Sequence, residues 1–150
     1  MKRTKVNFTF QSRLLPDNIK INDLKKAVKS IVNYVLISER KLLDSVNLLF
    51  CDDLTIIEYN KKYLKHNYET DIITFKYDDE SGISESDIII SLETVKRNSY
   101  TYKSGYLIEL IRVLIHGCLH ICGMDDNTPK KRILMKKKEN HYLKLTGLLK

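Results

Sequence analysis

The amino-acid sequence predicts an α+β fold in which a small mixed four-stranded sheet is packed with helices. Its 150 residues, 43% of them hydrophobic and 30% charged, suit one globular domain with one core. The spacing of apolar residues changes between a period of two, typical of strands, and steps of three and four, typical of helices. The long apolar stretch over residues 105–122 has helical length and contains no proline, which predicts a buried central helix.

The first half of the chain alternates strands and helices. Apolar and polar residues alternate over residues 3–11, which predicts a half-buried strand. Apolar residues at three- and four-residue steps predict an amphipathic helix over about 22–38. Residues 46–50 alternate again and predict a second strand. Asp52 or Asp53 can accept a hydrogen bond from the free amides of the next turn and so begin a short helix.

The second half adds two strands and ends in helices. Residues 71–75 are rich in β-branched side chains and predict a third strand, followed by a polar loop over 78–82. The apolar stretch over 87–91 predicts a central strand. Pro129 suits the first turn of a last helix that ends near residue 146. With the buried helix and one before it, the expected order is β-α-β-α-β-β-α-α-α.

Composition narrows the class of protein. There is no run of about 18 apolar residues, which argues against a membrane-spanning helix. The basic first residues lead into an alternating stretch, without the continuous apolar segment of a signal peptide. Three cysteines, an odd and small number, do not make a disulfide framework. We therefore expect a cytoplasmic monomer with one domain over residues 1–150 and no membrane partner.

The positive charge is concentrated at the end of the chain. The formal net charge is +7, and residues 129–150, with eight basic residues and the single acid Glu139, account for all of it. A clustered basic element is typical of proteins that bind a polyanion such as nucleic acid. The alternative interpretation is a solvated helix face.

Two histidines on the central helix carry the clearest chemical signal. His116 and His120 are four residues apart, so they lie on one helix face and can grip one metal ion. Gly123 can end the helix in the left-handed conformation, after which Asp125 or Asp126 can fold back toward the same ion. Two histidines and one carboxylate leave a coordination position open, as catalytic sites do. This pattern predicts that the central helix binds a metal. The alternative is that the two histidines pack in the core and bind no metal.

Two cysteines on the same helix do not fit that ion. Cys118 and Cys122 each follow a histidine by two residues, which is about 200° around the helix, so the thiols face away from the imidazoles. We interpret both, and Cys51, as small buried apolar residues.

Two charged residues precede the histidines on nearly the same helix face. Glu109 can hydrogen-bond a ring N–H and orient a ligand, or it is the solvated start of the helix. Arg112 can contact a phosphate or pair with Glu109. The residue after the first histidine is Gly117, where a zincin protease has its glutamate general base, so the sequence does not match that protease class.

Residues 116–126 resemble the motif of the YbeY endoribonuclease family of rRNA maturation factors, His-Gly-x-Leu-His-x-x-Gly-x-Asp-His, at every fixed position except the last. Residues 58–60 with 70–75, and residues 87–91, are similar to two further stretches of that family, in the expected order. The resemblance covers most of residues 46–128.

Two positions depart from the family pattern. Asp126 stands where the family motif has its third histidine, and a carboxylate oxygen also binds zinc. Leu64 stands where the family often has an arginine. Nearby lysines supply positive charge but lack the planar guanidinium group that can donate two parallel hydrogen bonds to a phosphate. The resemblance implies one zinc ion per chain, held by His116, His120 and Asp126; this harder donor set also suits manganese or nickel.

The resemblance further implies a cytoplasmic, single-strand-specific endoribonuclease that acts in maturation of the 3′ end of small-subunit (16S) rRNA and in ribosome quality control. Its partners would be single-stranded RNA, ribosomal RNA and the ribosome. A metal-activated water would attack the phosphodiester, with Asp125 as proton acceptor and Arg112 near a phosphate. Tyr59, Tyr63 and Tyr68 are available to stack on bases, although tyrosines more often serve packing.

Two other functions remain as alternatives. The first is a metal-dependent hydrolase of another bond, such as a peptide. The second is a non-catalytic ribosome-assembly factor whose metal is structural and whose basic last helix docks on rRNA.

Overall fold

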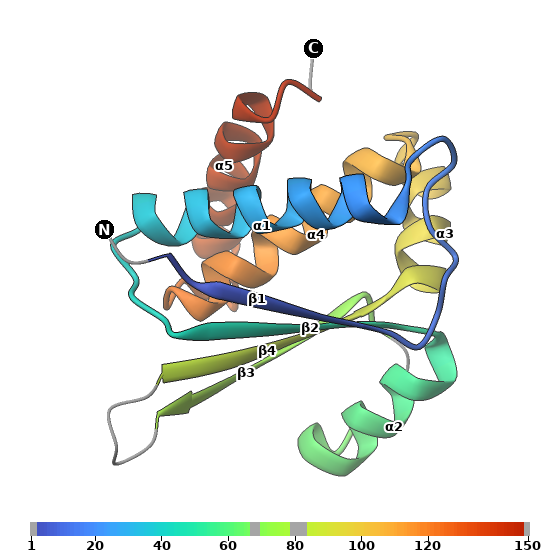
Figure 1. Ribbon diagram of the computed structural model, residues 1–150. Helices are drawn as coiled ribbons and strands as arrows, with labels where there is room; N and C mark the ends of the chain where they lie inside the picture. The colour runs from blue at the N-terminus through green and yellow to red at the C-terminus, as the bar shows by residue number, and fades with distance from the viewer. Residues whose placement is uncertain (1–2, 67–69, 79–83, 149–150) are drawn as a thin grey trace.

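The computed structural model describes residues 3–66, 70–78 and 84–148, and the elements within them follow the predicted order (Figure 1). They are β1 (Lys5–Phe10), α1 (Ile21–Ser38), β2 (Ser45–Cys51), α2 (Asp53–Leu64), β3 (Ile72–Asp78), β4 (Ser84–Ser91), α3 (Leu92–Tyr102), α4 (Tyr106–Ile121) and α5 (Pro129–Leu145). The α+β class and each predicted element are confirmed, with ends shifted by a few residues. The expected polar loop falls mainly outside the described residues.

The four strands form one mixed sheet in the order β1-β2-β4-β3. β1 and β2 run parallel, as do β2 and β4, whereas β3 pairs antiparallel with β4. β4 is therefore an interior strand, as its apolar sequence predicts, and Ile88 and Ile90 are fully buried. One row across the three parallel strands joins Asn7, Asn47 and Asp87, each 40 residues from the next.

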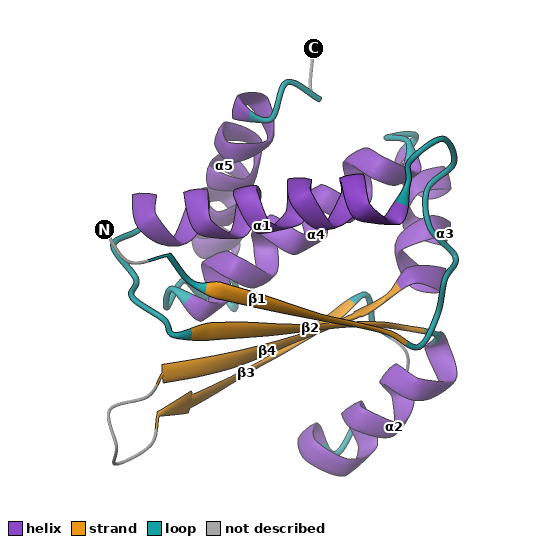
Figure 2. Ribbon diagram, viewed as in Figure 1, coloured by secondary structure: helices purple, strands orange, loops and turns teal. Residues whose placement is uncertain are grey.

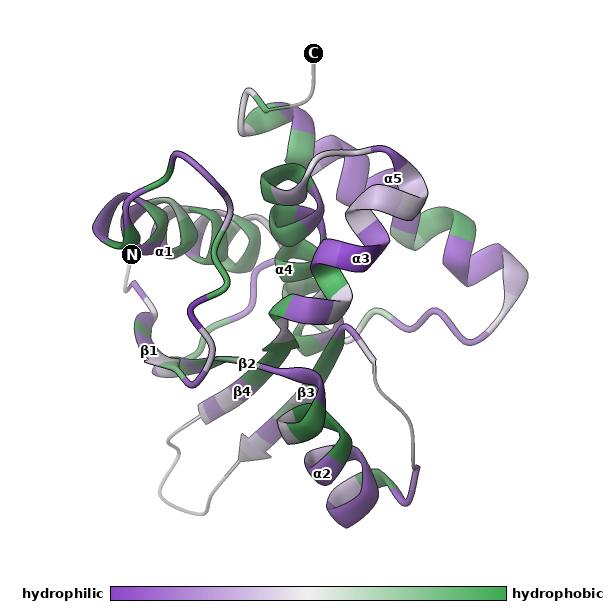
Figure 3. Ribbon diagram, turned by 90° about the vertical axis from the view of Figure 1, so that its right-hand side faces the viewer, coloured by the Kyte–Doolittle hydropathy of each residue, from purple (hydrophilic) through white to green (hydrophobic). Residues whose placement is uncertain are grey.

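Helices cover the two faces of the sheet unequally. α1, α4 and α5 lie on one side with α3 at the end of that layer, and α2 lies on the other side (Figures 1 and 2). Figure 3 shows hydrophobic residues along much of α4, whereas α5 is largely hydrophilic. In the described part of the chain no single helix is long and apolar enough to cross a membrane, although α3 and α4, bent by 115° between them, together pass that test of length and composition.

α4 forms the centre of the helical layer. Leu110, Ile111, Leu114 and Ile115 are almost completely buried and join the main core with apolar residues of α1 and the sheet. Burying one such side chain contributes roughly 1.5–3 kcal/mol relative to leaving it exposed. α4 is thus the buried central helix that the sequence predicts.

Gly117 lies where α4 packs on the β3-β4 pair. A Cβ atom added to Gly117 would lie 2.5 Å from Cδ1 of Ile72 and 3.5 Å from Cγ2 of Ile88. A side chain at this position would therefore require the terminal methyl group of Ile72 to shift, whereas the contact with Ile88 would be an ordinary van der Waals contact. Gly117 thus marks a point where α4 packs closely on the sheet.

Side chains cap the starts of α2 and α5. The amide of Thr55 donates to the Asp52 carboxylate at 2.9 Å, so Asp52 rather than its neighbour caps α2. The amide of Lys131 donates to the Thr128 hydroxyl at 3.2 Å, and Pro129 occupies the first turn of α5.

The three cysteines are free thiols, and two of them are buried as predicted. Cys51 and Cys118 are buried and Cys122 is half-buried. Burial raises the pKa of Cys51 to about 12 and that of Cys122 to about 11, so both are protonated at neutral pH.

Asp53 ties α2 to the end of β4 and to α3. Its carboxylate accepts hydrogen bonds of 2.6 Å from the hydroxyls of Ser91 and Thr94, and lies 2.8 Å from the Arg97 guanidinium. Burial alone would raise the pKa of Asp53, but these three partners outweigh it and hold the pKa below its usual range.

We expect Asp53→Asn to reduce the loss of folding stability that occurs as the pH is lowered. Because folding lowers this pKa, the ionised carboxylate stabilises the fold above its unfolded pKa of about 4, and this contribution is lost as pH falls through the lower folded value. Urea unfolding at neutral pH and at about pH 3 should therefore show a larger loss of unfolding free energy in the wild type than in Asp53→Asn. The exposed residue Asp17 provides the matched control, and equal losses in wild type, Asp53→Asn and Asp17→Asn would contradict this role.

Candidate metal centre

The end of α4 turns the chain back toward its own histidines. Gly123 has a φ of +98°, and its amide donates to the carbonyl of His120, while the amide of Met124 donates to the carbonyl of Leu119. This pair of hydrogen bonds is a Schellman motif, which ends helices at a glycine in the left-handed region. Gly123 therefore acts as the sequence predicts, and residues 124–126 run back beside the helix.

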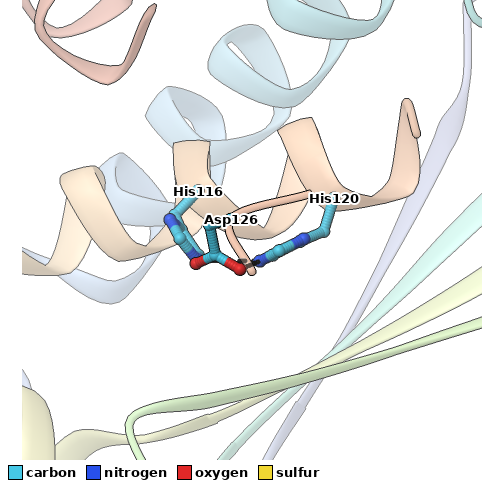
Figure 4. A group of neighbouring side chains, drawn as sticks. All are labelled: His116, His120 and Asp126. Carbon is cyan, nitrogen blue, oxygen red and sulfur yellow. Dashed lines mark hydrogen bonds and ion pairs between the residues drawn. The ribbon is translucent and has the colours of Figure 1, made fainter. Parts of the chain in front are cut away.

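Three side chains converge beside this turn (Figure 4). Nε2 of His116 and Nε2 of His120 are 2.9 Å apart. Oδ2 of Asp126 is 3.4 Å from Nε2 of His116, and its Oδ1 is 3.6 Å from Nε2 of His120. The three side chains are 24%, 25% and 37% exposed, in the order His116, His120 and Asp126, so solvent reaches all of them.

The donor set and its spacing fit one divalent ion. Two nitrogens bound to the same tetrahedral zinc at 2.0–2.1 Å lie about 3.3 Å apart. The three separations of 2.9, 3.4 and 3.6 Å are close to that value, so the donor atoms are spaced as those that share one ion are. Two imidazoles and one carboxylate supply three of four ligands and leave one position for water or substrate.

Each imidazole is held by a hydrogen bond from its other ring nitrogen. Nδ1–H of His120 donates to the carbonyl of Met124 at 2.9 Å, and Nδ1–H of His116 donates to Oε2 of Glu139 at 2.8 Å. A carbonyl or carboxylate only accepts, so Nδ1 carries the proton in both rings and Nε2 keeps its lone pair for the cluster. Such partners fix the ring orientation and increase the basicity of the ligand.

Glu139 lies in a charged group behind His116. Its Oε1 is 3.9 Å from the guanidinium of Arg112. Burial alone would lower the pKa of His116, but the hydrogen bond to Glu139 and the negative charges of Glu139, Asp126 and Asp71 raise it. A proton and a metal ion therefore compete for His116 as the pH falls.

The two aspartates after the helix differ clearly in position. Asp126 joins the histidines, as the sequence predicts for the third ligand. The side chain of Asp125 is 65% exposed and lies 4.0 Å from Nζ of Lys131. Asp125 is thus a neighbour of the cluster at its solvent side, and its role as proton acceptor stays a prediction.

The two charged residues earlier on α4 have partners that sequence reasoning did not identify. Arg112 donates to Oδ1 of Asn140 on α5 at 2.8 Å. Glu109 is buried, and the hydroxyl of Ser104 donates to it at 3.2 Å, so it is neither the solvated helix start nor the partner of a histidine ring. Burial raises the pKa of Glu109, against the opposing effects of Ser104 and Arg112.

Two carboxylates of this region were absent from the predicted site. Glu139 is the single acid among the basic residues 129–150, and a lone acid on a basic helix is a sequence signal for an inward-facing partner. Asp71 precedes β3; burial raises its pKa, and the charge of His116 acts in the opposite direction. Its position just before a strand gives no comparable signal.

The fold and the cluster define a class of α+β proteins whose central helix and following turn present two histidines and a carboxylate to one position. A family model described as Endoribonuclease YbeY matches residues 10–147. The chain belongs to the YbeY endoribonuclease family, and the resemblance seen in the sequence is confirmed.

Several bacterial relatives are similar over most of their length. The chain is 43% identical over 119 residues to the endoribonuclease YbeY of Parabacteroides distasonis, covering 79% of this chain and 83% of that protein. It is 41% identical over 128 residues to that of Bacteroides fragilis, covering 85% and 91%. The solution structure of a Thermotoga maritima protein shares the fold, with a TM-score of 0.63 at 22% identity over 94% of this chain and 88% of that one.

We expect Asp126→Ala to weaken zinc binding by one or more factors of ten, each worth about 1.4 kcal/mol, because it removes one of three donors. Asp126→His should retain zinc, since an imidazole nitrogen at that position is also a good ligand. Asp125→Ala is the matched control and should bind as the wild type does. Competition with a chromogenic chelator measures the zinc affinity of the wild type and the three variants. Weak zinc binding by Asp125→Ala together with full binding by Asp126→Ala would identify Asp125, rather than Asp126, as the third ligand.

We expect Glu139→Ala to weaken zinc binding by about 10–100-fold, because it leaves Nδ1–H of His116 without its acceptor. Glu139→Gln keeps an acceptor oxygen and should be less affected. The same zinc competition, with helical circular dichroism as the check on folding, compares them with Glu58→Ala, which removes an exposed acid on α2. Equal affinities in Glu139→Ala and Glu58→Ala would show that Glu139 does not support the ligand.

Proposed function

We propose that this chain is a zinc-dependent endoribonuclease that cleaves single-stranded RNA in maturation of the 3′ end of 16S rRNA and in ribosome quality control. The observation that carries the proposal is the convergence of His116, His120 and Asp126 on one solvent-accessible position in a member of an endoribonuclease family. The proposed setting is the cytoplasm, the proposed partners are rRNA and the ribosome, and the proposed active form is a monomer.

In this proposal the three donors hold the metal and the residues behind them keep the donors in place. A bound zinc ion would supply an activated water with a pKa of about 7 and would polarise a phosphoryl oxygen. Glu139 and the carbonyl of Met124 fix the histidine rings so that both Nε2 atoms point to one place. The hydrogen-bonded rings need little reorganisation when charge develops on the phosphate.

Two further residues have proposed catalytic roles. In this proposal Asp125, which is exposed and directly precedes Asp126 in the chain, accepts the proton of the attacking water. Arg112 has 23% of its side chain exposed and brings positive charge to the same side of α4, where it can meet the phosphate. Its contact with Asn140 holds the guanidinium in place between α4 and α5.

The basic residues of α5 support an RNA substrate. Lys130, Lys131, Lys136 and Lys137 are exposed, whereas Lys138 is committed to an ion pair of 2.5 Å with Glu39. Glu139 and Asn140 of the same helix contact His116 and Arg112, so α5 connects an exposed basic surface with the metal centre. Phosphates held on α5 would therefore lie near the donors.

The alternative functions make different demands on the site. A zincin peptidase needs a carboxylate at position 117, where Gly117 instead packs against Ile72. A structural zinc site is closed by four protein ligands, whereas the three donors here are reached by solvent. Both observations support hydrolysis at an open site, and the family supports RNA as the substrate.

The direct test is cleavage of RNA by the purified protein. We expect cleavage of a single-stranded RNA and not of the corresponding duplex, loss of cleavage with a chelator, and recovery with added zinc. His120→Ala should lose cleavage while keeping its helical circular dichroism. Unfolding by the chelator would indicate a structural metal, and cleavage retained after both histidines are replaced would exclude this site.

The contribution of α5 is testable by salt dependence. Replacing Lys136 and Lys137 with glutamine should flatten the fall of log affinity with log salt, by about 0.7 for each phosphate of a single strand that the protein no longer neutralises. Lys26→Gln with Lys29→Gln removes the same charge from α1 and serves as the control. Fluorescence anisotropy at several salt concentrations gives the slopes, and equal slopes in both double variants would leave α5 as a merely solvated face.

A further inference from the structure

The face of the sheet opposite α4 carries a second organised group of side chains. Leu49 and Ile89 on this face pack with Ile56 of α2, which identifies it as the α2 side of the sheet. Because side chains alternate between the two faces of a strand, Asn47 and Asp87, two residues earlier on the same strands, share that face. The row continues to both edges of the sheet through the register partners Asn7, Asn47, Asp87 and Phe75.

A hollow of about 290 Å³ lies on this face beside α2. Leu49 and Ile89 form an apolar floor, Tyr59 of α2 contributes an aromatic wall, and Asn47 and Asp87 line it with polar groups. An apolar floor with a few convergent polar groups is typical of a small-molecule site, and this volume is near the lower end of that class.

Hydrogen bonds between neighbouring strands hold these polar groups in a row, and the row can still accept further hydrogen bonds. Nδ2 of Asn7 donates to Oδ1 of Asn47 at 2.9 Å, and Nδ2 of Asn47 donates to Oδ1 of Asp87 at 3.0 Å. The hydroxyl of Tyr77 also hydrogen-bonds Asp87. A carboxylate can accept about four hydrogen bonds, so Asp87 keeps acceptor positions for a ligand.

Aromatic rings continue from the hollow along α2 and the edge strand β3. Tyr59 and Tyr63 stack at 5.9 Å, Tyr63 meets Phe75 edge-on at 5.5 Å, and Phe75 stacks with Tyr77 at 6.4 Å between centroids. Tyr63 and Tyr77 are 53% and 50% exposed. Nζ of Lys62 lies 5.3 Å from the centre of the Tyr63 ring, which places a positive charge beside the exposed rings.

We propose that this hollow binds one nucleobase of a single-stranded RNA, with bases that carry an exocyclic amino group preferred over uracil, and that Tyr63 and Tyr77 stack on neighbouring bases. The inference rests on the proposed function in taking RNA as the ligand. Exposed rings beside a positive charge are the usual means of holding an unpaired strand. Asp87 accepts from an amino group, as carboxylates do in reading cytosine, whereas the corresponding carbonyl of uracil would face it acceptor to acceptor.

The hollow is separate from the metal centre, but both lie close to the edge strand β3. α4, which carries the two histidines, lies on one side of the sheet, and α2 lies on the other (Figure 1). β3 is the edge strand on which α4 packs through Gly117, and it also carries Phe75 and Tyr77. A strand that passes around this edge can reach both sites, which an unpaired RNA can do with its bases splayed outward.

The test compares binding of labelled oligo(A), oligo(C) and oligo(U), each about 12 nucleotides long, to the full-length protein as purified. Fluorescence anisotropy gives the affinities, and denaturing electrophoresis shows that the probe is still intact. Tyr63→Ala and Tyr77→Ala should each weaken oligo(A) binding roughly tenfold. Tyr100→Ala removes a tyrosine that is 71% exposed on α3 and should leave binding unchanged.

Two further measurements make the result decisive. Asp87→Asn replaces one of the two acceptor oxygens with a donor NH₂ group, so it should reduce the preference for oligo(A) and oligo(C) over oligo(U). Ultraviolet crosslinking of the wild type should place RNA on peptides that contain Tyr63 or Tyr77. RNA cleavage by the wild type together with equal affinities of Tyr63→Ala, Tyr77→Ala and Tyr100→Ala would overturn this inference and leave the proposed function standing. Absence of both binding and cleavage in the wild type would overturn both.

Discussion

The packing of α4 on β3 and β4, where Gly117 lies close to Ile72, positions the helix that carries the candidate metal centre. Most of the surface of α4 is committed to the apolar core. Its polar residues Glu109, Arg112, His116 and His120 recur at steps of three and four, so they form one stripe along the helix. The packing of α4 on β3 and β4 therefore determines where this stripe lies.

α5 has a structural role as well as a charged surface. Met135, Glu139, Tyr142 and Leu143, spaced as one helix face, are buried, while most of the lysines lie elsewhere on the helix. The same helix thus completes the core, supports His116 through Glu139 and exposes positive charge. The single acid of this otherwise basic segment is therefore an inward-facing residue.

Much of the fold and site was predictable because the signals are local. Apolar periodicity located each element, and the glycine that ends α4 indicated that Asp126 can return to the histidines. Features that depend on distant neighbours were not predictable. The sequence could not separate the roles of Asp52 and Asp53, because the partners of Asp53 lie about forty residues further along the chain. For the same reason, the burial of Glu109 and the contact of Glu139 with His116 required the assembled structure.

The register of the parallel strands has a consequence for how the chain folds. Because β1, β2 and β4 pair residues that are 40 positions apart, the central sheet contains no local hairpin until β3 and β4 are both present. Pairing across such separations raises the contact order, and proteins of high contact order fold more slowly than helical bundles of equal length. During synthesis β1 and β2 leave the ribosome before β4, so the sheet cannot be complete until β4 has followed. The ligands of the candidate metal centre lie later in the chain than all four strands. Any folding of the candidate site during synthesis therefore has to follow the emergence of all four strands.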